Sequence, residues 1–448
     1  MTLDGAPGLE IDPLLDDPAT RIIVCCGAGG VGKTTTAAAL GVRAAERGRK
    51  VVVLTIDPAR RLAQSMGIDR LDNVPRRVDG IKGGGELHAM MLDMKRTFDE
   101  IVEGHAEPAR AAAILANPFY QSLSAGFAGT QEYMAMEKLG QLRAREEWDL
   151  IVVDTPPSRS ALDFLDAPKR LGSFLDGTFI KLLMAPAKVG GRAGMRFLNA
   201  GMSMMTGTLG KLLGGQLLRD VQTFVAAMDT MFGGFRTRAD ATYRLLQAPG
   251  TAFLVVAAPE RDALREAAYF VERLAAERMP LAGLVLNRVH GSGAARLSAE
   301  RALAAAENLE EGRIVDQGPG KTGVRGPDGT SPEPEAPRTT AARPDAPIAT
   351  AAADTDVSGA PVGTDGDTTT GAGTGLVVTP PAVADVTAGL LRLHAERMQV
   401  LARERRTRDR FAALHPEVAV TEVPALPGDV HDLAGLRTIG DRLAEGHH

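Results

Sequence analysis

A glycine-rich loop between an apolar run and an alanine-rich run constrains this chain more than any other feature. Residues 21–35 read Arg-Ile-Ile-Val-Cys-Cys-Gly-Ala-Gly-Gly-Val-Gly-Lys-Thr-Thr. Among them, Gly27, Gly32, Lys33 and Thr34 satisfy the pattern G-x-x-x-x-G-K-[ST]. Backbone N–H groups can surround an oxyanion where no side chain obstructs the loop, and a helix N-terminus adds positive potential. The pattern therefore predicts a phosphate-binding loop in which Lys33 reaches the β- and γ-phosphates and Thr34 binds Mg²⁺.

The residues on either side of the loop support this interpretation. The β-branched run 22–24 predicts a strand before it, and residues 35–47 predict an alanine-rich helix that ends at Gly48. A structural glycine turn is the alternative, because the chain contains 50 glycines. The residues expected to bind nucleotide here are Gly27, Gly29, Gly30, Val31, Gly32, Lys33, Thr34 and Thr35.

Apolar runs recur along the chain, with helical patterns between them. Residues 51–56, 150–153 and 253–256 are almost wholly apolar, which is typical of parallel strands covered by helices on both faces. We therefore predict an α/β fold of P-loop NTPase type, with a doubly wound, mostly parallel sheet of about seven or eight strands. The expected strands are 21–26, 51–56, 87–93, 150–153, 251–257, 282–287 and 418–423.

Two segments interrupt this alternation. Residues 158–245 contain no convincing strand and predict a helical subdomain inserted in the core. Residues 311–378 are acidic, rich in Pro, Gly and Thr, and lack aromatic residues. They bury too little to offset the entropy of ordering, so we expect them to be disordered within a loop of the core. The P-loop core would then comprise residues 20–157 and 246–445, after a flexible N-terminal arm of residues 1–19.

Composition argues against several classes of protein. The net charge of −5 argues against a bulk nucleic-acid binder, so no nucleic-acid partner is expected. Cys25 and Cys26 are neighbours on a predicted strand, so they should point to opposite faces as buried residues and are poorly placed to share a metal. The sequence shows neither a signal peptide nor an apolar stretch of about 18 residues. We therefore expect a cytoplasmic protein, at most peripheral to a membrane.

Two aspartates directly follow predicted strands. Asp57 comes after the run 51–56 and Asp154 after the run 150–153, each before a proline-containing loop. Such residues also occur as turn formers and helix N-caps. Beside a phosphate loop, however, the carboxyl ends of strands are where ligands for a metal and an ordered water are expected. In this interpretation Asp57 and Asp154 are ligands of Mg²⁺ and of the ordered water, together with Thr34.

Several spaced motifs resemble those of a known family. They are residues 27–35, 55–62, 126–132, 154–162, 253–266, 284–288 and 421–427. Together they resemble the ArsA-type ATPases, the family of the anion-pump ATPase and of the guided-entry factor that delivers tail-anchored membrane proteins. The resemblance covers most of residues 20–310 and 383–445. It implies a dimerising, deviant P-loop ATPase whose cofactors are ATP and Mg²⁺.

The resemblance implies roles for four residues at the phosphates. Lys33 would clamp the phosphates and, with Asp57, would form the catalytic pair. Asp57 would orient or deprotonate the attacking water. Thr34 would ligate Mg²⁺ directly, and Asp154 would hold it through water.

The resemblance also implies contacts away from the phosphates. Asn287, within 284–288, would read adenine by hydrogen bonds. Pro424 would pack near the base. Glu260 lies at the position that contacts nucleotide across the dimer interface of the family.

This chain departs from the family pattern at the loop. The family normally carries a lysine one residue after the first glycine, which reaches into the partner's site, and here that position is Ala28. Either a paralogous partner supplies the cation or Arg60, Arg61 or Arg159 does, although solvated surface arginines are an equally good interpretation of these three. The family's zinc-binding cysteine pair and the three thiolates needed for arsenite are also absent, which argues against a zinc-linked dimer and against arsenite pumping.

Three functions fit these features. The leading one is a dimerising ATPase that couples nucleotide state to a membrane-associated partner or hydrophobic client, as a homodimer or with a paralog. The uncharged, methionine-containing segment 197–210 suits an adaptable apolar surface, although interior packing or a dimer contact is the favoured interpretation. The alternatives are an ATP-binding regulatory subunit, weakly active beside a lysine-bearing paralog, and a partitioning or positioning ATPase.

Overall fold

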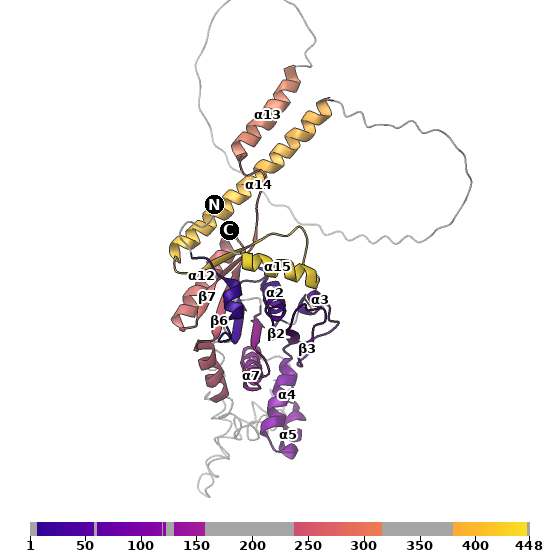
Figure 1. Cartoon of the computed structure of the whole chain (residues 1–448), viewed down its shortest axis with the longest axis vertical. Coiled ribbons are helices and arrows are strands. Elements are labelled where there is room, and N and C mark those ends of the chain that lie inside the picture. Colours follow the sequence, from indigo (N-terminus) through magenta and orange to yellow (C-terminus); the bar gives the residue numbers. More distant parts are fainter. Residues whose placement is uncertain are drawn as a thin grey trace, which may run out of the picture. The chain divides into compact units, whose positions relative to one another are not determined.

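The computed structural model describes residues 7–57, 61–118, 120–121, 130–156, 237–315 and 380–445. They include an eight-stranded sheet of order β3-β4-β2-β5-β1-β6-β7-β8. Figure 1 draws its strands as arrows among the surrounding helices. Only β3 is antiparallel to its neighbour among these strands. The strands are β1 (Ile22–Cys26), β2 (Lys50–Thr55), β3 (Arg76–Arg77), β4 (Glu86–Met91), β5 (Leu150–Asp154), β6 (Thr251–Ala257), β7 (Leu281–Val289) and β8 (Val420–Pro424). The predicted α/β fold with a mostly parallel sheet is confirmed.

Strand β1 lies at the centre of the sheet, between β5 and β6, and is wholly buried. Because successive strand residues point to opposite faces, Ile22, Val24 and Cys26 join the core on one face. Ile23 and Cys25 join the core on the other face. The two cysteines are therefore buried, free thiols on opposite faces of the sheet, as expected.

Helices cover both faces of the sheet, as in a doubly wound fold. One core contains α2 (Lys33–Glu46), α3 (Arg61–Ser65) and α15 (Leu433–Glu445). The alanine-rich α2 packs between the sheet and α15. The other core contains α4 (Met94–His105), α5 (Pro108–Leu115), α7 (Thr130–Ala144) and α12 (Arg261–Ala276). In the part of the chain that the structure describes, no helix is both long enough and apolar enough to cross a bilayer.

The described residues 296–315 and 380–396 belong to a second unit. This unit contains α13 (Ala299–Val315) and the first part of α14 (Pro380–Leu414), whose remainder belongs to the unit with the sheet. Within the smaller unit, His394 Nε2 lies 2.9 Å from the carbonyl oxygen of Leu297.

The two segments expected to interrupt the core lie mainly outside the described residues. Of 158–245, the structure describes only the last residues, which are part of a helix over 237–247. Of 311–378, only the first residues are described, and they continue α13 instead of being disordered, because strong helix formers flank Gly312. The inserted helical subdomain and the disorder of the remaining residues stay predictions.

The N-terminal segment differs from the expected flexible arm. Residues 7–19 are ordered around the short helix α1 (Ile11–Asp16), whose Ile11 and Leu15 face the core at helical spacing. Arg43 of α2 holds Asp12 through an ion pair of 2.5 Å. The chain before α1 also pairs with β8, where Leu9 N donates to the Val420 carbonyl at 3.0 Å. The prediction of a flexible arm overlooked the helical spacing of Ile11 and Leu15. Residues 1–6 lie outside the described residues.

We predict that Leu15→Ala lowers the free energy of unfolding by about 2–4 kcal/mol, because the Leu15 side chain is fully buried. Leu14 is its matched control, since it lies next to Leu15 on α1 but is only partly buried. Leu14→Ala should cost less than about 1 kcal/mol. Urea denaturation measures both, and equally small effects would show that the segment is not docked in solution.

Candidate active site

The glycine-rich loop joins β1 to α2 and requires glycine at two positions. Gly27 has φ 148°, and a Cβ there would lie 2.1 Å from the carbonyl oxygen of Val256 on β6. Gly32 has φ 97°, and a Cβ there would lie 2.2 Å from the amide nitrogen of the Asn287 side chain. Only glycine fits both the backbone angle and the space. The loop therefore lies close against two strands and leaves the N-terminus of α2 accessible to an anion.

Lys33 is the first residue of α2 and lies over the loop. Its Nζ donates a hydrogen bond of 2.7 Å to the carbonyl oxygen of Ala28, and the residue is only 5% exposed. Burial lowers the pKa of Lys33, while the negative charges of Asp154 and Asp57 act in the opposite direction. The ammonium group is thus held inside the site, between the loop and two carboxylates.

Asp154 lies at the carboxyl end of β5 and is fully buried. Its Oδ2 accepts hydrogen bonds from Thr34 Oγ1 at 2.8 Å and from Thr55 Oγ1 at 2.9 Å. Its Oδ1 is buried with no hydrogen-bond partner among the described residues. An unpaired carboxylate oxygen beside a threonine hydroxyl suits a hard cation such as Mg²⁺, so these residues fit the metal expected there.

Burial raises the pKa of Asp154 to about 6 from its ordinary value of 3.8. The hydrogen bonds from Thr34 and Thr55 and the charge of Lys33 act against this shift without cancelling it. A cation beside Asp154 would favour the ionised carboxylate. Metal and proton should therefore compete for this group in mildly acidic solution.

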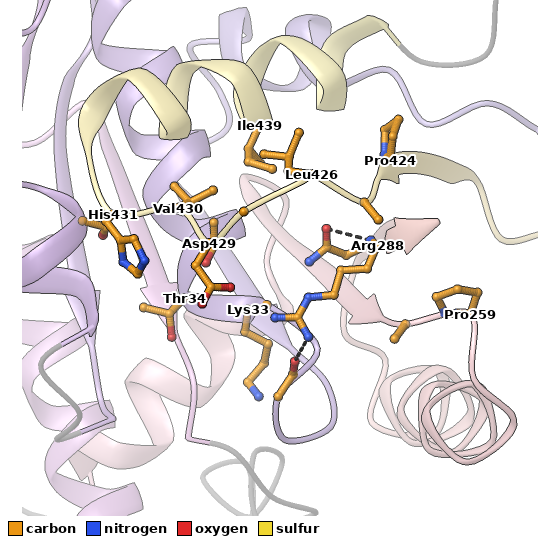
Figure 2. A pocket seen from close by; sticks show the side chains of 18 of the residues that line it. Lys33, Thr34, Pro259, Arg288, Pro424, Leu426, Asp429, Val430, His431 and Ile439 are labelled. Carbon is orange, nitrogen blue, oxygen red and sulfur yellow. Dashed lines mark hydrogen bonds between the residues drawn. The ribbon is translucent and has the colours of Figure 1, made fainter. Parts of the chain in front are cut away.

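A pocket of about 900 Å³ brings residues from distant parts of the sequence together (Figure 2). The predicted site residues that line it are Gly30, Gly32, Lys33, Thr34, Thr35, Asp57, Glu260, Asn287 and Pro424. The expected phosphate contacts and the expected adenine contacts therefore share one pocket. The other predicted residues, which do not belong to its described lining, are Gly27, Gly29, Val31 and Asp154.

The end of β7 sends two consecutive side chains to the loop. Asn287 Nδ2 donates to the Val31 carbonyl at 2.8 Å, and Arg288 Nη1 donates to the Gly30 carbonyl at 3.1 Å. Sequence reasoning selected Asn287 but assigned no role to Arg288. It missed Arg288 because neighbouring strand residues are expected to point to opposite faces.

The segment between β8 and α15 forms a second wall of the pocket. Pro424 was expected here, and the lining continues through His431. Leu426 and Val430 make part of this wall apolar, and Asp429 adds a carboxylate (Figure 2). The motif that predicted this wall covers residues 421–427. Asp429 and His431 lie beyond it and were not predicted.

The described residues do not identify the cation that is expected to replace the missing loop lysine. Ala28 is buried and its carbonyl accepts the Lys33 hydrogen bond. Arg60 and Arg159 lie outside the described residues, and the side chain of Arg61 is not described either. Their proposed role stays a prediction.

The comparison with protein families decides the classification of the chain. The family described as anion-transporting ATPase, ArsA_ATPase, matches residues 20–301, which include the glycine-rich loop, Asp57, Asp154 and Asn287. The chain belongs to this family. The resemblance read from the motifs is thereby confirmed.

Relatives in the ArsA ATPase family include fungal proteins named ATPase GET3. The one from Malassezia globosa is 31% identical over 170 residues, covering 38% of this chain and 49% of the relative. The one from Podospora anserina is 27% identical over 288 residues, covering 64% and 78%. The one from Botryotinia fuckeliana is 26% identical over 280 residues, covering 62% and 75%. The chain thus spans about half of the first relative and about three quarters of the other two.

We predict that the free energy of unfolding of the nucleotide-free protein falls as the pH rises from about 4 to about 6, because of Asp154. In this range the unfolded chain releases the proton of this carboxyl while the folded protein retains it, because the folded pKa is about 6 and the ordinary value is 3.8. The folded state therefore binds more protons, and its stability falls as the pH rises until the folded pKa is passed. Over this pH range Asp154 should lower the free energy of unfolding by up to about 3 kcal/mol.

Asp154→Asn should remove this part of the pH dependence, because asparagine has no proton to lose in this range. Urea denaturation of the wild type and of the variant at several pH values measures it. Asp79→Asn changes an exposed aspartate and serves as the control. Parallel stability profiles of the wild type and Asp154→Asn would contradict the raised pKa.

Proposed function

We propose that this chain binds and hydrolyses ATP in a Mg²⁺-dependent reaction. The observation that carries the proposal is the convergence of Lys33, Thr34 and Asp57 in one pocket with Asn287 and Pro424. Membership of the ArsA ATPase family supports the same activity. The names of the fungal relatives, each an ATPase, agree with it.

The reaction assigns separate tasks to the groups at the phosphates. Lys33 and the loop amides bind the triphosphate and balance its charge. Asp57, which follows β2 at the pocket wall, orients the attacking water in line with the leaving oxygen and takes up its proton. Thr34, with Asp154 and Asp57 through water, would hold Mg²⁺, which neutralises charge on the phosphate oxygens when bound.

The remaining pocket residues suit the nucleoside. The Asn287 side-chain amide is buried beside the loop and offers both a donor and an acceptor to a base edge. The neighbouring apolar wall with Pro424 and Leu426 can pack against the ring. Glu260, at the start of α12, lines the same pocket and is proposed to contact nucleotide bound to a partner protomer.

We further propose that nucleotide state controls a dimer that binds a partner or a hydrophobic client. Loss of the γ-phosphate would remove charge and contacts from the loops after β2 and β5. The segment assigned to the client lies within residues 158–245, mostly outside the described residues, so this part rests on the family resemblance and the sequence. A cytoplasmic location is proposed on the same basis.

We predict that Lys33→Ala and Asp57→Asn each lower ATP turnover at least about 100-fold. Lys33→Ala should also weaken ATP binding, because it removes a buried cation from the phosphates. Asp57→Asn should weaken ATP binding less than Lys33→Ala does, because the Asp57 carboxylate acts on the attacking water and would contact Mg²⁺ only through water. Phosphate release and calorimetric ATP binding measure the two effects.

Two exposed residues provide controls for these variants. Lys82→Ala and Asp69→Asn make the same chemical changes away from the pocket and should retain turnover. Hydrolysis at the wild-type rate by either Lys33→Ala or Asp57→Asn would contradict the assigned roles.

A second candidate function is that of an ATP-binding regulatory subunit paired with a lysine-bearing paralog. The observation that favours it is Ala28, which is buried and brings no cation to the loop. In this case the purified chain binds ATP but turns it over slowly.

We predict that Ala28→Lys raises the turnover of the purified chain at least about tenfold, because it supplies the missing cation. Ala28→Met is the matched control, since it adds a similar length without charge. Steady-state phosphate release measures both variants, and native mass determination of the complex from its source identifies homodimer or heterodimer. Fast wild-type turnover that Ala28→Lys does not increase would eliminate the regulatory candidate.

A further inference from the structure

The end of β7 is irregular beside the glycine-rich loop. Asn287 pairs with Val423 and Val289 pairs with Pro424, so Arg288 is an extra residue in the register with β8. Arg288 also has φ 62°, a backbone angle that non-glycine residues seldom adopt. Such a β-bulge redirects a side chain, and bulges are common beside functional sites.

The bulge determines where the Arg288 side chain goes. Consecutive residues of a regular strand point to opposite faces. Here Asn287 and Arg288 both reach the loop and donate to neighbouring carbonyls, those of Val31 at 2.8 Å and Gly30 at 3.1 Å. Figure 2 shows the Arg288 side chain and its bond to the loop. The left-handed backbone of Arg288 thus allows two adjacent side chains to hold two adjacent peptide groups.

Hydrogen bonds on both sides of Arg288 maintain this backbone. Arg288 N donates to Asn287 Oδ1 at 3.0 Å. Two residues further on, His290 Nδ1 lies 2.6 Å from Glu404 Oε1, and His290 N donates to Glu404 Oε2 at 3.4 Å. A disfavoured backbone conformation persists only where its surroundings hold it in place. Here Asn287 of β7 and Glu404 of α14 provide the hydrogen bonds that hold it.

Holding a carbonyl also directs an N–H group. In a trans peptide, the C=O of one residue and the N–H of the next point in opposite directions. The bond from Arg288 to the Gly30 carbonyl therefore sets the direction of the Val31 N–H, and the bond from Asn287 to the Val31 carbonyl sets that of the Gly32 N–H. Successive N–H groups held in this way form an anion-binding concavity.

We propose that Arg288 is a positioning residue that directs the loop N–H groups toward the phosphates before nucleotide binds. Arginine suits this task because its guanidinium presents several donors in one rigid plane, whereas lysine is a point charge on a flexible stem. The proposal rests on the proposed nucleotide binding and names a residue that sets its affinity.

The test compares Arg288→Gly and Arg288→Ala with Arg278→Gly. Arg278 is a matched control, because it is an exposed arginine with φ 55° that does not belong to the described pocket lining. Glycine relieves the positive φ at either position, so both glycine variants should keep or raise the melting temperature. Arg288→Gly therefore separates loss of the guanidinium from backbone strain.

Calorimetric titration with ATP and magnesium chloride gives the first readout. Both Arg288 variants should raise the Kd for ATP about threefold to tenfold, as expected for one lost hydrogen bond, and Arg278→Gly should not change it. Arg288→Lys should bind with intermediate affinity. Wild-type affinity in Arg288→Gly would overturn the proposal.

Hydrogen exchange of the nucleotide-free protein gives a second readout that does not depend on ATP. Amides of residues 27–33 should exchange faster in Arg288→Gly than in the wild type and stay unchanged in Arg278→Gly. If the wild type binds no ATP, the proposed function fails while this readout still tests the loop contact. Unchanged exchange in Arg288→Gly would overturn the positioning role.

Discussion

The buried carboxylate of Asp154 is the group around which the phosphate end of the site is organised. Its Oδ2 accepts hydrogen bonds from Thr34 at the start of α2 and from Thr55 at the end of β2. Three segments that are distant in sequence therefore meet at one oxygen atom. Burying a carboxylate in this way is costly unless a proton, donors or a cation compensates it, and the raised pKa of Asp154 expresses that cost. A divalent cation, proposed to bind here, would offset the same cost.

The sheet makes this meeting possible. Thr55 and Asp154 are register partners on the parallel strands β2 and β5, and parallel strands bring their carboxyl ends to one edge. The central strand β1 is buried on both faces and bonded on both sides, so the loop that follows it starts from a rigid position. Close contact of Gly27 with β6 then fixes how the loop leaves the strand. A well-packed core thus determines the geometry of a polar site.

Local sequence patterns predicted the seven longer strands because most of them are short, largely apolar runs, but they missed the exposed pair Arg76–Arg77 of β3. They also selected Lys33, Thr34 and Asp57, and the family resemblance added Asn287; all four line the pocket. The contacts of the site residues could not be predicted from local patterns. Thr55, for example, meets Asp154 only because β2 pairs with β5. Arg288 was missed for a related reason, since its direction depends on a bulge and on a positive φ. Residues whose roles depend on register or backbone irregularity carry no local signal.

The cations around the loop bear on both proposed tasks, nucleotide binding and turnover. Among the described residues of the pocket lining, Lys33 and Arg288 carry permanent positive charge. Lys33 is bound to the Ala28 carbonyl and Arg288 to the Gly30 carbonyl, so both also organise the backbone of the loop. Such an arrangement favours binding of the ground-state triphosphate, whereas rapid hydrolysis needs charge that becomes more favourable in the transition state. With Ala28 in place of a loop lysine, we propose that Lys33 serves both binding and turnover, while a further cation needed for fast turnover comes from outside this loop.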